Sequence, residues 1–208
     1  MPKTTAILIA ILALVTGILV YLAVTSQSAR RAPTTQNIVP TEKPVEKTAQ
    51  VFFNPQNVDL SSGSATSALT VDIMVDSGGQ DITGVQAELQ FDPKALANVK
   101  LLPATGTTSF FGSAVNVLFN DVDTQTGRIS YATAIPPGGT PKKGVGKIAT
   151  LNFQKAYGVP SSTQIVFLDK TLVTVLGANQ SALKATVPLN IVLFSQTPNG
   201  FTPSITPL

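Results

Sequence analysis

From residue 51 onward, hydrophobic and polar residues alternate along the chain in short runs. In residues 69–76, LTVDIMVD, the hydrophobic Val71, Ile73 and Val75 occupy every second position. Residues 85–91, VQAELQF, alternate in the same way. A period of two places one set of side chains on one face of a β-strand. Both segments are therefore predicted to be strands with one buried and one solvent-facing side.

Further strands are expected in seven segments: residues 96–102, 114–120, 128–134, 147–155, 163–168, 171–176 and 185–194. Clusters of Gly, Pro, Asn and Asp separate them, and these residues are typical of turns. No segment of this region has a convincing helical stripe. We therefore expect an all-β fold, an antiparallel jelly-roll sandwich of about nine strands spanning residues 51–194.

The N-terminal part has a different pattern. Residues 6–24, AILIAILALVTGILVYLAV, contain no charge. As a helix they would span about 28 Å, close to the roughly 30 Å of a bilayer's hydrocarbon core. We expect a transmembrane signal anchor in residues 1–27. A cleaved signal peptide is the main alternative, although its apolar region is usually about 7–15 residues long. A buried core helix fits poorly with the polar stretch that follows.

Two segments lack any hydrophobic period. Residues 28–50 are rich in Pro, Thr, Lys and Glu, which is the composition of an extended linker. Residues 195–208 contain three prolines and no repeat of hydrophobic positions. We expect a linker in the first and a disordered tail, or a linker to a further part, in the second.

Composition excludes several kinds of chemistry. The chain has no His and no Cys, so a Ser-His-Asp triad, a Cys nucleophile and a thiolate metal site are all excluded. Glu88 is the only Glu in the predicted domain, and no pattern in the sequence indicates a second carboxylate that would complete a glycosidase pair. No Gly-rich loop leads from a strand into a helix, so no phosphate cradle is indicated. We expect a protein that is not an enzyme and needs no cofactor.

Charge argues against nucleic acid as a partner. The net charge of +3 lies entirely before residue 51, where Lys and Arg outnumber Glu by five to two. The remainder of the chain is neutral, whereas a nucleic-acid-binding domain carries clustered basic residues.

One cluster of oxygen ligands could suggest calcium. Asn120, Asp121, Asp123 and Thr124 lie close together in the sequence, and carboxylate and amide oxygens bind Ca²⁺. The rest of an EF-hand loop is absent. A hairpin turn explains the same residues, and we favour that interpretation, so no metal site is predicted.

The order of these features resembles a cohesin domain. Residues 84–93, GVQAELQFDP, are an alternating strand that ends in aromatic-Asp-Pro, and they resemble the family's third strand. Residues 51–55, 120–131 and 146–153 resemble its opening strand, a hairpin of strands five and six, and the entry to its seventh strand. The four pieces occur in the family's order, and the resemblance extends over about residues 51–194.

This resemblance implies a function in protein docking. Cohesins bind dockerin modules in polysaccharide-degrading assemblies, through a flat sheet around strands three, five and six. It also implies an extracellular, cell-surface domain. The orientation rests on the resemblance alone, because the positive-inside rule does not decide between Lys3 before the apolar segment and Arg30 and Arg31 after it. The residues that the resemblance places on this face are Gln86, Glu88, Gln90, Asn116, Asn120, Arg128 and Ser130.

Direct carbohydrate binding is the alternative function. Sugar-binding faces usually present flat aromatic rings, and the domain has no Trp. Tyr131, Tyr157 and the pair Phe110 and Phe111 are the candidates, although packing at the end of the sandwich suits the Phe pair better. An open strip of these rings would favour sugars. A flat polar face without them would favour a protein partner.

Overall fold

The computed structural model describes residues 14–21, 45–61, 68–157 and 160–194. The chain divides into two compact units, Met1–Glu42 and Lys43–Leu208. In the first unit the described residues 14–21 are helical. No helix within the described ranges combines the length and the apolar character that crossing a membrane requires. Most of the 6–24 segment lies outside the described residues.

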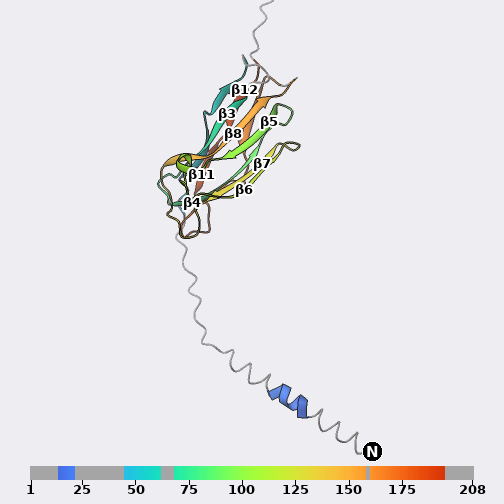
Figure 1. Cartoon of the computed structure of the whole chain (residues 1–208), viewed down its shortest axis with the longest axis vertical. Helices are drawn as coiled ribbons and strands as arrows, with labels where there is room; N and C mark the ends of the chain where they lie inside the picture. The colour runs from blue at the N-terminus through green and yellow to red at the C-terminus, as the bar shows by residue number, and fades with distance from the viewer. Residues whose placement is uncertain (1–13, 22–44, 62–67, 158–159, 195–208) are drawn as a thin grey trace, which may run out of the picture. The chain divides into compact units, whose positions relative to one another are not determined.

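The second unit is a sandwich of two β-sheets (Figure 1). The five-stranded sheet runs in the order β11-β1-β3-β8-β5, and the seven-stranded sheet in the order β2-β12-β9-β4-β7-β6, with β10 paired to β4. The strands are β1 (Ala49–Asn54), β2 (Asn57–Asp59), β3 (Leu69–Asp76), β4 (Ile82–Gln90), β5 (Leu96–Pro103), β6 (Asn116–Asp123), β7 (Arg128–Ala134), β8 (Val145–Lys155), β9 (Ser162–Phe167), β10 (Leu172–Val175), β11 (Leu183–Val187) and β12 (Leu189–Val192). A 3₁₀ turn, η1 (Gly106–Thr108), follows β5.

The all-β prediction is confirmed, with corrections in strand number and direction. The predicted strand 185–194 is two strands in different sheets, because Pro188 has no N–H to continue a ladder and the chain crosses between the sheets there. The sheets are not purely antiparallel, since β1 pairs with β11, and β2 with β12, in parallel. Strand β2 was not predicted, because three residues are too few to show a period.

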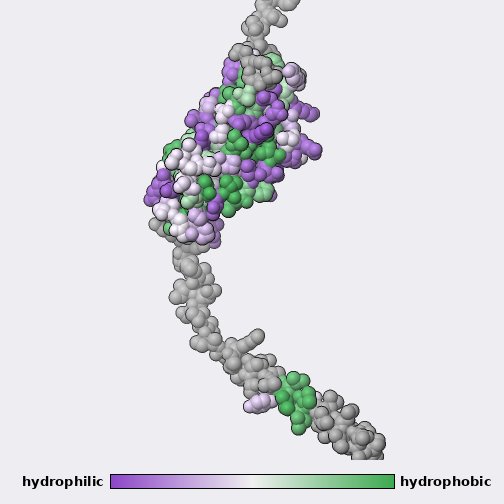
Figure 2. Space-filling model, viewed as in Figure 1, coloured by the Kyte–Doolittle hydropathy of each residue, from purple (hydrophilic) through white to green (hydrophobic). Residues whose placement is uncertain are grey.

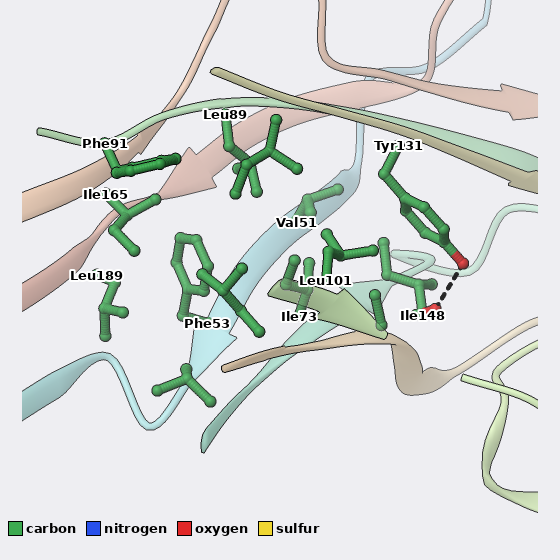
Figure 3. Packing of buried hydrophobic residues seen from close by; sticks show 14 of the residues in the cluster. Val51, Phe53, Ile73, Leu89, Phe91, Leu101, Tyr131, Ile148, Ile165 and Leu189 are labelled. Carbon is green, nitrogen blue, oxygen red and sulfur yellow. Dashed lines mark hydrogen bonds between the residues drawn. The ribbon is translucent and has the colours of Figure 1, made fainter. Parts of the chain in front are cut away.

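The core lies between the sheets and comes from the alternating positions. Val71, Ile73 and Val75 of β3 are at most 1% exposed, as their spacing predicts. They belong to one hydrophobic cluster with residues of the other sheet, and Figure 3 shows Ile73 in that cluster with Leu89 of β4 and Ile165 of β9. Tyr131 of β7 crosses the core, and its hydroxyl donates to the carbonyl oxygen of Ile148 in β8 at 2.9 Å. Burial of this apolar area is the main stabilising contribution to the fold.

Candidate functional site

The strands that the sequence singled out lie side by side. Strands β10, β4, β7 and β6 are neighbours in the seven-stranded sheet. Their side chains directed away from the core form a surface that we call the outer face. It has two parts, a polar end near the β6–β7 hairpin turn and an apolar groove at the opposite end of the strands.

Five of the predicted residues form the polar end. Glu88 lies opposite Ser130, and Gln90 opposite Arg128, in the register of β4 with β7. The Glu88 carboxylate accepts hydrogen bonds from Ser130 Oγ at 2.7 Å, Arg128 Nη2 at 3.0 Å and Gln86 Nε2 at 3.1 Å. The Gln90 side-chain amide donates to the carbonyl oxygens of Phe91 and Thr126. The five side chains are thus held by one another and by the hairpin.

Glu88 itself is only 7% exposed. Burial raises the pKa of its carboxyl, but the hydrogen bonds from Ser130, Arg128 and Gln86 outweigh that effect, and the pKa is lowered overall. The carboxylate therefore stays ionised and paired with Arg128. A partner would meet the arginine and the neighbouring amides before it met this carboxylate.

The two Asn residues of β6 lie on different sides of the strand. Asn116 is paired with Ala134 and is exposed beside the groove. Asn120 is paired with the buried Tyr131, and its side-chain amide donates to the carbonyl oxygen of Leu101 in the other sheet at 3.3 Å. The expectation that Asn120 shares the outer face is therefore wrong. A β-bulge between Val117 and Phe119 is the reason, since one extra residue reverses the alternation.

Sequence reasoning missed the apolar part of the outer face. Leu118 and Phe119 are 65% and 53% exposed, and Leu176 after β10 is 68% exposed. Val117 is also 41% exposed, although it pairs with the buried Thr133 and lies on the other side of the strand. Hydrophobic surface is visible along the side of the domain where Figure 1 labels β6 and β7 (Figure 2). The sequence did carry a signal, because three large apolar residues in a row cannot all be buried by a strand of period two.

Two of these side chains, Leu118 and Leu176, line a shallow groove of about 440 Å³. Its lining includes Leu118, Ala134, Pro136, Pro137, Thr174 and Leu176. A smaller hollow of about 140 Å³ shares Leu118, Ala134 and Thr174 and reaches Gln86 and Leu172. The groove thus leads toward the polar end of the same face.

The aromatic candidates for sugar binding do not come together. Tyr131 is 1% exposed and bonded within the core. Phe110 and Phe111 pack edge-to-face against each other, Phe111 within the core and Phe110 beside it, as expected for the end of a sandwich. Tyr157, 84% exposed, is the one of these candidates that is open to solvent. The four rings therefore do not form an open strip.

The hydrogen bonds of Asp123 bear on the calcium hypothesis. Both oxygens of Asp123 accept hydrogen bonds within the β6–β7 turn, from the Thr126 hydroxyl at 2.6 Å and from the Gln125 and Thr126 amides. The Thr126 hydroxyl bond is the main cause of the lowered pKa of this carboxyl. The hairpin interpretation therefore accounts for the residue. Within the described ranges no group of three acidic side chains could hold a metal.

The arrangement of the two sheets matches solved structures. Neither a protein-family model nor a curated protein matches the chain by sequence. Among solved structures, the third cohesin of ScaC from Acetivibrio cellulolyticus, in complex with the ScaB dockerin, superimposes with a TM-score of 0.54 at 18% identity. The match covers 71% of this chain and 99% of that one. The domain has the cohesin fold.

Two other solved structures agree with this assignment. A type I cohesin–dockerin complex from Clostridium thermocellum matches with a TM-score of 0.53 at 15% identity, covering 70% of this chain and 98% of that one. The CaCohA2 structure from Clostridium acetobutylicum matches with a TM-score of 0.54 at 15% identity, covering 74% and 95%. At these identities the similarity establishes the cohesin-like fold and leaves the ligand to be argued from the surface.

Proposed function

We propose that this chain is a non-enzymatic docking module whose outer face binds a dockerin-like protein. The observation that carries the proposal is the outer face itself. It is built from β10, β4, β7 and β6 of a cohesin-like domain, and it combines an ordered polar end with exposed apolar side chains. Protein interfaces likewise combine apolar side chains with polar ones. Gln86, Glu88, Gln90, Asn116, Arg128 and Ser130 are the proposed polar contacts.

The arginine is the strongest polar candidate in this set. The Arg128 side chain is 43% exposed although one of its nitrogens is 3.0 Å from Glu88. Its Nε also donates to the same carboxylate, so Glu88 orients a side chain that is still open to solvent, and arginine is enriched at interface hot spots. Glu88 would act by positioning Arg128 rather than by touching the partner.

The test is a binding experiment with two kinds of ligand. The full chain, purified in a mild detergent, is immobilised and exposed to the extracellular proteins of the source organism and, separately, to soluble and insoluble polysaccharides. We expect capture of a protein that is lost in Ala132→Arg, which places a large charge in the middle of the outer face. Thr70→Arg, an exposed position of β3 in the other sheet, is the matched control and should retain capture.

Two results would overturn the proposal. Retention on a polysaccharide without protein capture would move the function to carbohydrate recognition. Equal loss of capture in Ala132→Arg and Thr70→Arg would show that the outer face is not the binding surface.

We further propose that residues 6–24 attach the chain to a membrane with the sandwich on the extracellular side. The uncharged run supports this. So do the exposed apolar side chains of the described helix, among them Leu14, Ile18 and Leu19. Alkaline carbonate extraction of cells should leave the chain in the membrane fraction, and protease added to intact cells should remove the sandwich. Release by carbonate would contradict the attachment.

A further inference from the structure

Strand β6 is an open edge of the seven-stranded sheet. It stands last in the strand order and pairs only with β7 among the described residues, so one row of its backbone N–H and C=O groups faces outward. Proteins usually protect such edges with very short strands, with Lys or with Pro. The strands at the other ends of the two sheets follow this rule, since β2 has three residues, β5 contains Lys100 and Pro103, and β11 contains Lys184. Strand β6 has eight residues and no Lys, Arg or Pro.

The core side of β6 is not fully closed by the domain. Val117 pairs with the buried Thr133 and Val122 with the buried Ile129, which places both valines on the core side. Yet Val117 is 41% exposed and Val122 is only partly buried, whereas the core-side residues of β7 are at most 1% exposed. Removing apolar area from water is favourable. A further strand beside β6 would therefore gain free energy by covering the valines.

A β-bulge decides which part of this edge can pair with another strand. The bulge lies between Val117 and Phe119, and from Phe119 to Asp123 each residue of β6 faces one residue of β7. These five residues form a regular stretch, and strands of 3–10 residues are usual in proteins. Phe119 and Asp121 both lie on the outer side of the stretch, about 6.6 Å apart along the strand. The side chains of an added strand would meet them at every second position.

The charge of the edge favours a cationic partner. Asp121 is exposed, and its carboxylate has no hydrogen bond or ion pair among the described residues. Asp123 is held in the turn by Thr126, and β6 has no basic residue to balance either carboxylate. Pairing with β6 of a second copy would bring two more aspartates to the same edge, and like charges facing each other across strands are destabilising. A strand of another protein that carries Lys or Arg fits the edge better.

We propose that the free edge of β6 accepts an extended segment of another protein as an added β-strand. In this segment an apolar residue lies beside Phe119, a Lys or Arg two positions away lies beside Asp121, and an aliphatic residue on the opposite side covers Val122. Backbone hydrogen bonds supply the affinity, and these three positions select the sequence. The inference goes beyond the proposed function, because it concerns the edge of the sheet and not its outer face.

The test uses a synthetic peptide of about nine residues. It has aliphatic residues on one side of the strand and, on the other side, an apolar residue two positions from a Lys. Two further peptides keep every side chain but carry N-methyl groups on either the odd or the even residues. Successive N–H groups of a strand point to opposite edges, so only one set can face β6. Fluorescence anisotropy with the full chain in mild detergent should show that one methylated peptide binds like the parent and the other does not bind.

Variants of the chain locate the site. Asp121→Asn should weaken binding by up to about fivefold, the effect of one exposed ion pair. Asp121→Lys reverses the charge in the middle of the edge and should remove binding. Asp59→Lys is the matched control and should leave binding unchanged, because Asp59 is an exposed acid on β2 at the opposite end of the same sheet. With the peptide bound, alternate backbone N–H groups of residues 119–123 should exchange with solvent more slowly.

Several results would overturn the inference: no binding of the parent peptide, equal binding or equal loss for the two methylated peptides, binding that survives Asp121→Lys, or no slower exchange in β6. Self-association of the chain that Asp121→Lys removes would also overturn it, by identifying a second copy as the occupant of the edge. A chain that captures an extracellular protein but fails these peptide tests would keep the proposed function and lose this inference alone.

Discussion

The hydroxyl of Tyr131 provides a quantitative test of how the two sheets are joined. It comes from β7, in the seven-stranded sheet, and donates to the Ile148 carbonyl oxygen in β8 of the five-stranded sheet. The side chain is 1% exposed, so water does not compete for the bond. Tyr131→Phe removes the hydroxyl and keeps the ring that fills the core.

The cost follows from what remains bonded after the substitution. The Ile148 carbonyl oxygen also accepts the backbone N–H of Ala104 at 3.0 Å, so it is not left without a partner. The loss is then the net value of one hydrogen bond, about 0.5–1.5 kcal/mol, rather than the penalty for a buried orphan group. For a domain of this size, that lowers the melting temperature by roughly 1–6 °C.

The measurement is thermal and urea denaturation of the wild type and Tyr131→Phe at neutral pH and above pH 10. Burial raises the pKa of the Tyr131 phenol above its ordinary value of 10.0. The neutral phenol therefore stabilises the fold below pH 10, and this contribution is lost as the pH rises through the raised pKa. The difference in stability between the wild type and Tyr131→Phe should therefore become smaller above pH 10.

Tyr157→Phe is the matched control. That side chain is 84% exposed, and its substitution should change stability by less than about 0.5 kcal/mol. A loss above about 3 kcal/mol in Tyr131→Phe, or a gap that does not narrow in alkali, would refute the reasoning.

Three further predictions concern the outer face and its hairpin. The pKa of Glu88 is lowered, so its contribution to stability is complete above the ordinary pKa of 4.5 and is lost as the pH falls below it. Glu88→Gln should therefore lower the free energy of unfolding at pH 7. In denaturation curves the variant should also lose less stability between pH 5 and 3 than the wild type does. Gly127→Ala should destabilise by at least about 2 kcal/mol, because φ is +74° and a Cβ would lie 2.2 Å from the Phe91 carbonyl oxygen; Gly138→Ala, also at positive φ but in open space, should cost less. Calcium should not raise the melting temperature above that in chelator, because the Asp123 oxygens are engaged in the turn; a rise of several degrees would restore the calcium hypothesis.

The sequence predicts regular strands well and irregular ones poorly. The bounds of β3 and β7 agree with the predicted 69–76 and 128–134, because both strands alternate without interruption between a buried and an exposed face. Strand β6 was misplaced by two to three residues. Its bulge adds a residue, and no local pattern distinguishes a bulge from a continuous strand.

In the candidate site, too, the sequence predicts what depends on regular alternation and misses what depends on distant strands. Alternation along β4 correctly places Gln86, Glu88 and Gln90 on one side. It does not indicate that Glu88 is nearly covered, since that depends on Arg128 and Ser130 from a strand 40 residues later in the chain. The groove is lined by Leu176 and Leu118 from strands far apart in the sequence, an arrangement that only the tertiary structure creates.

The central claim is that the outer face of the seven-stranded sheet docks a protein, and site-specific crosslinking tests it most directly. The chain contains no Cys, so a single introduced cysteine can carry a photoreactive group at a chosen place. Leu172→Cys places it on the outer face beside Gln86, and Thr70→Cys places it on the other sheet. The account predicts that illumination in the presence of extracellular proteins yields a protein adduct from Leu172→Cys and none from Thr70→Cys. An adduct from Thr70→Cys alone would contradict it.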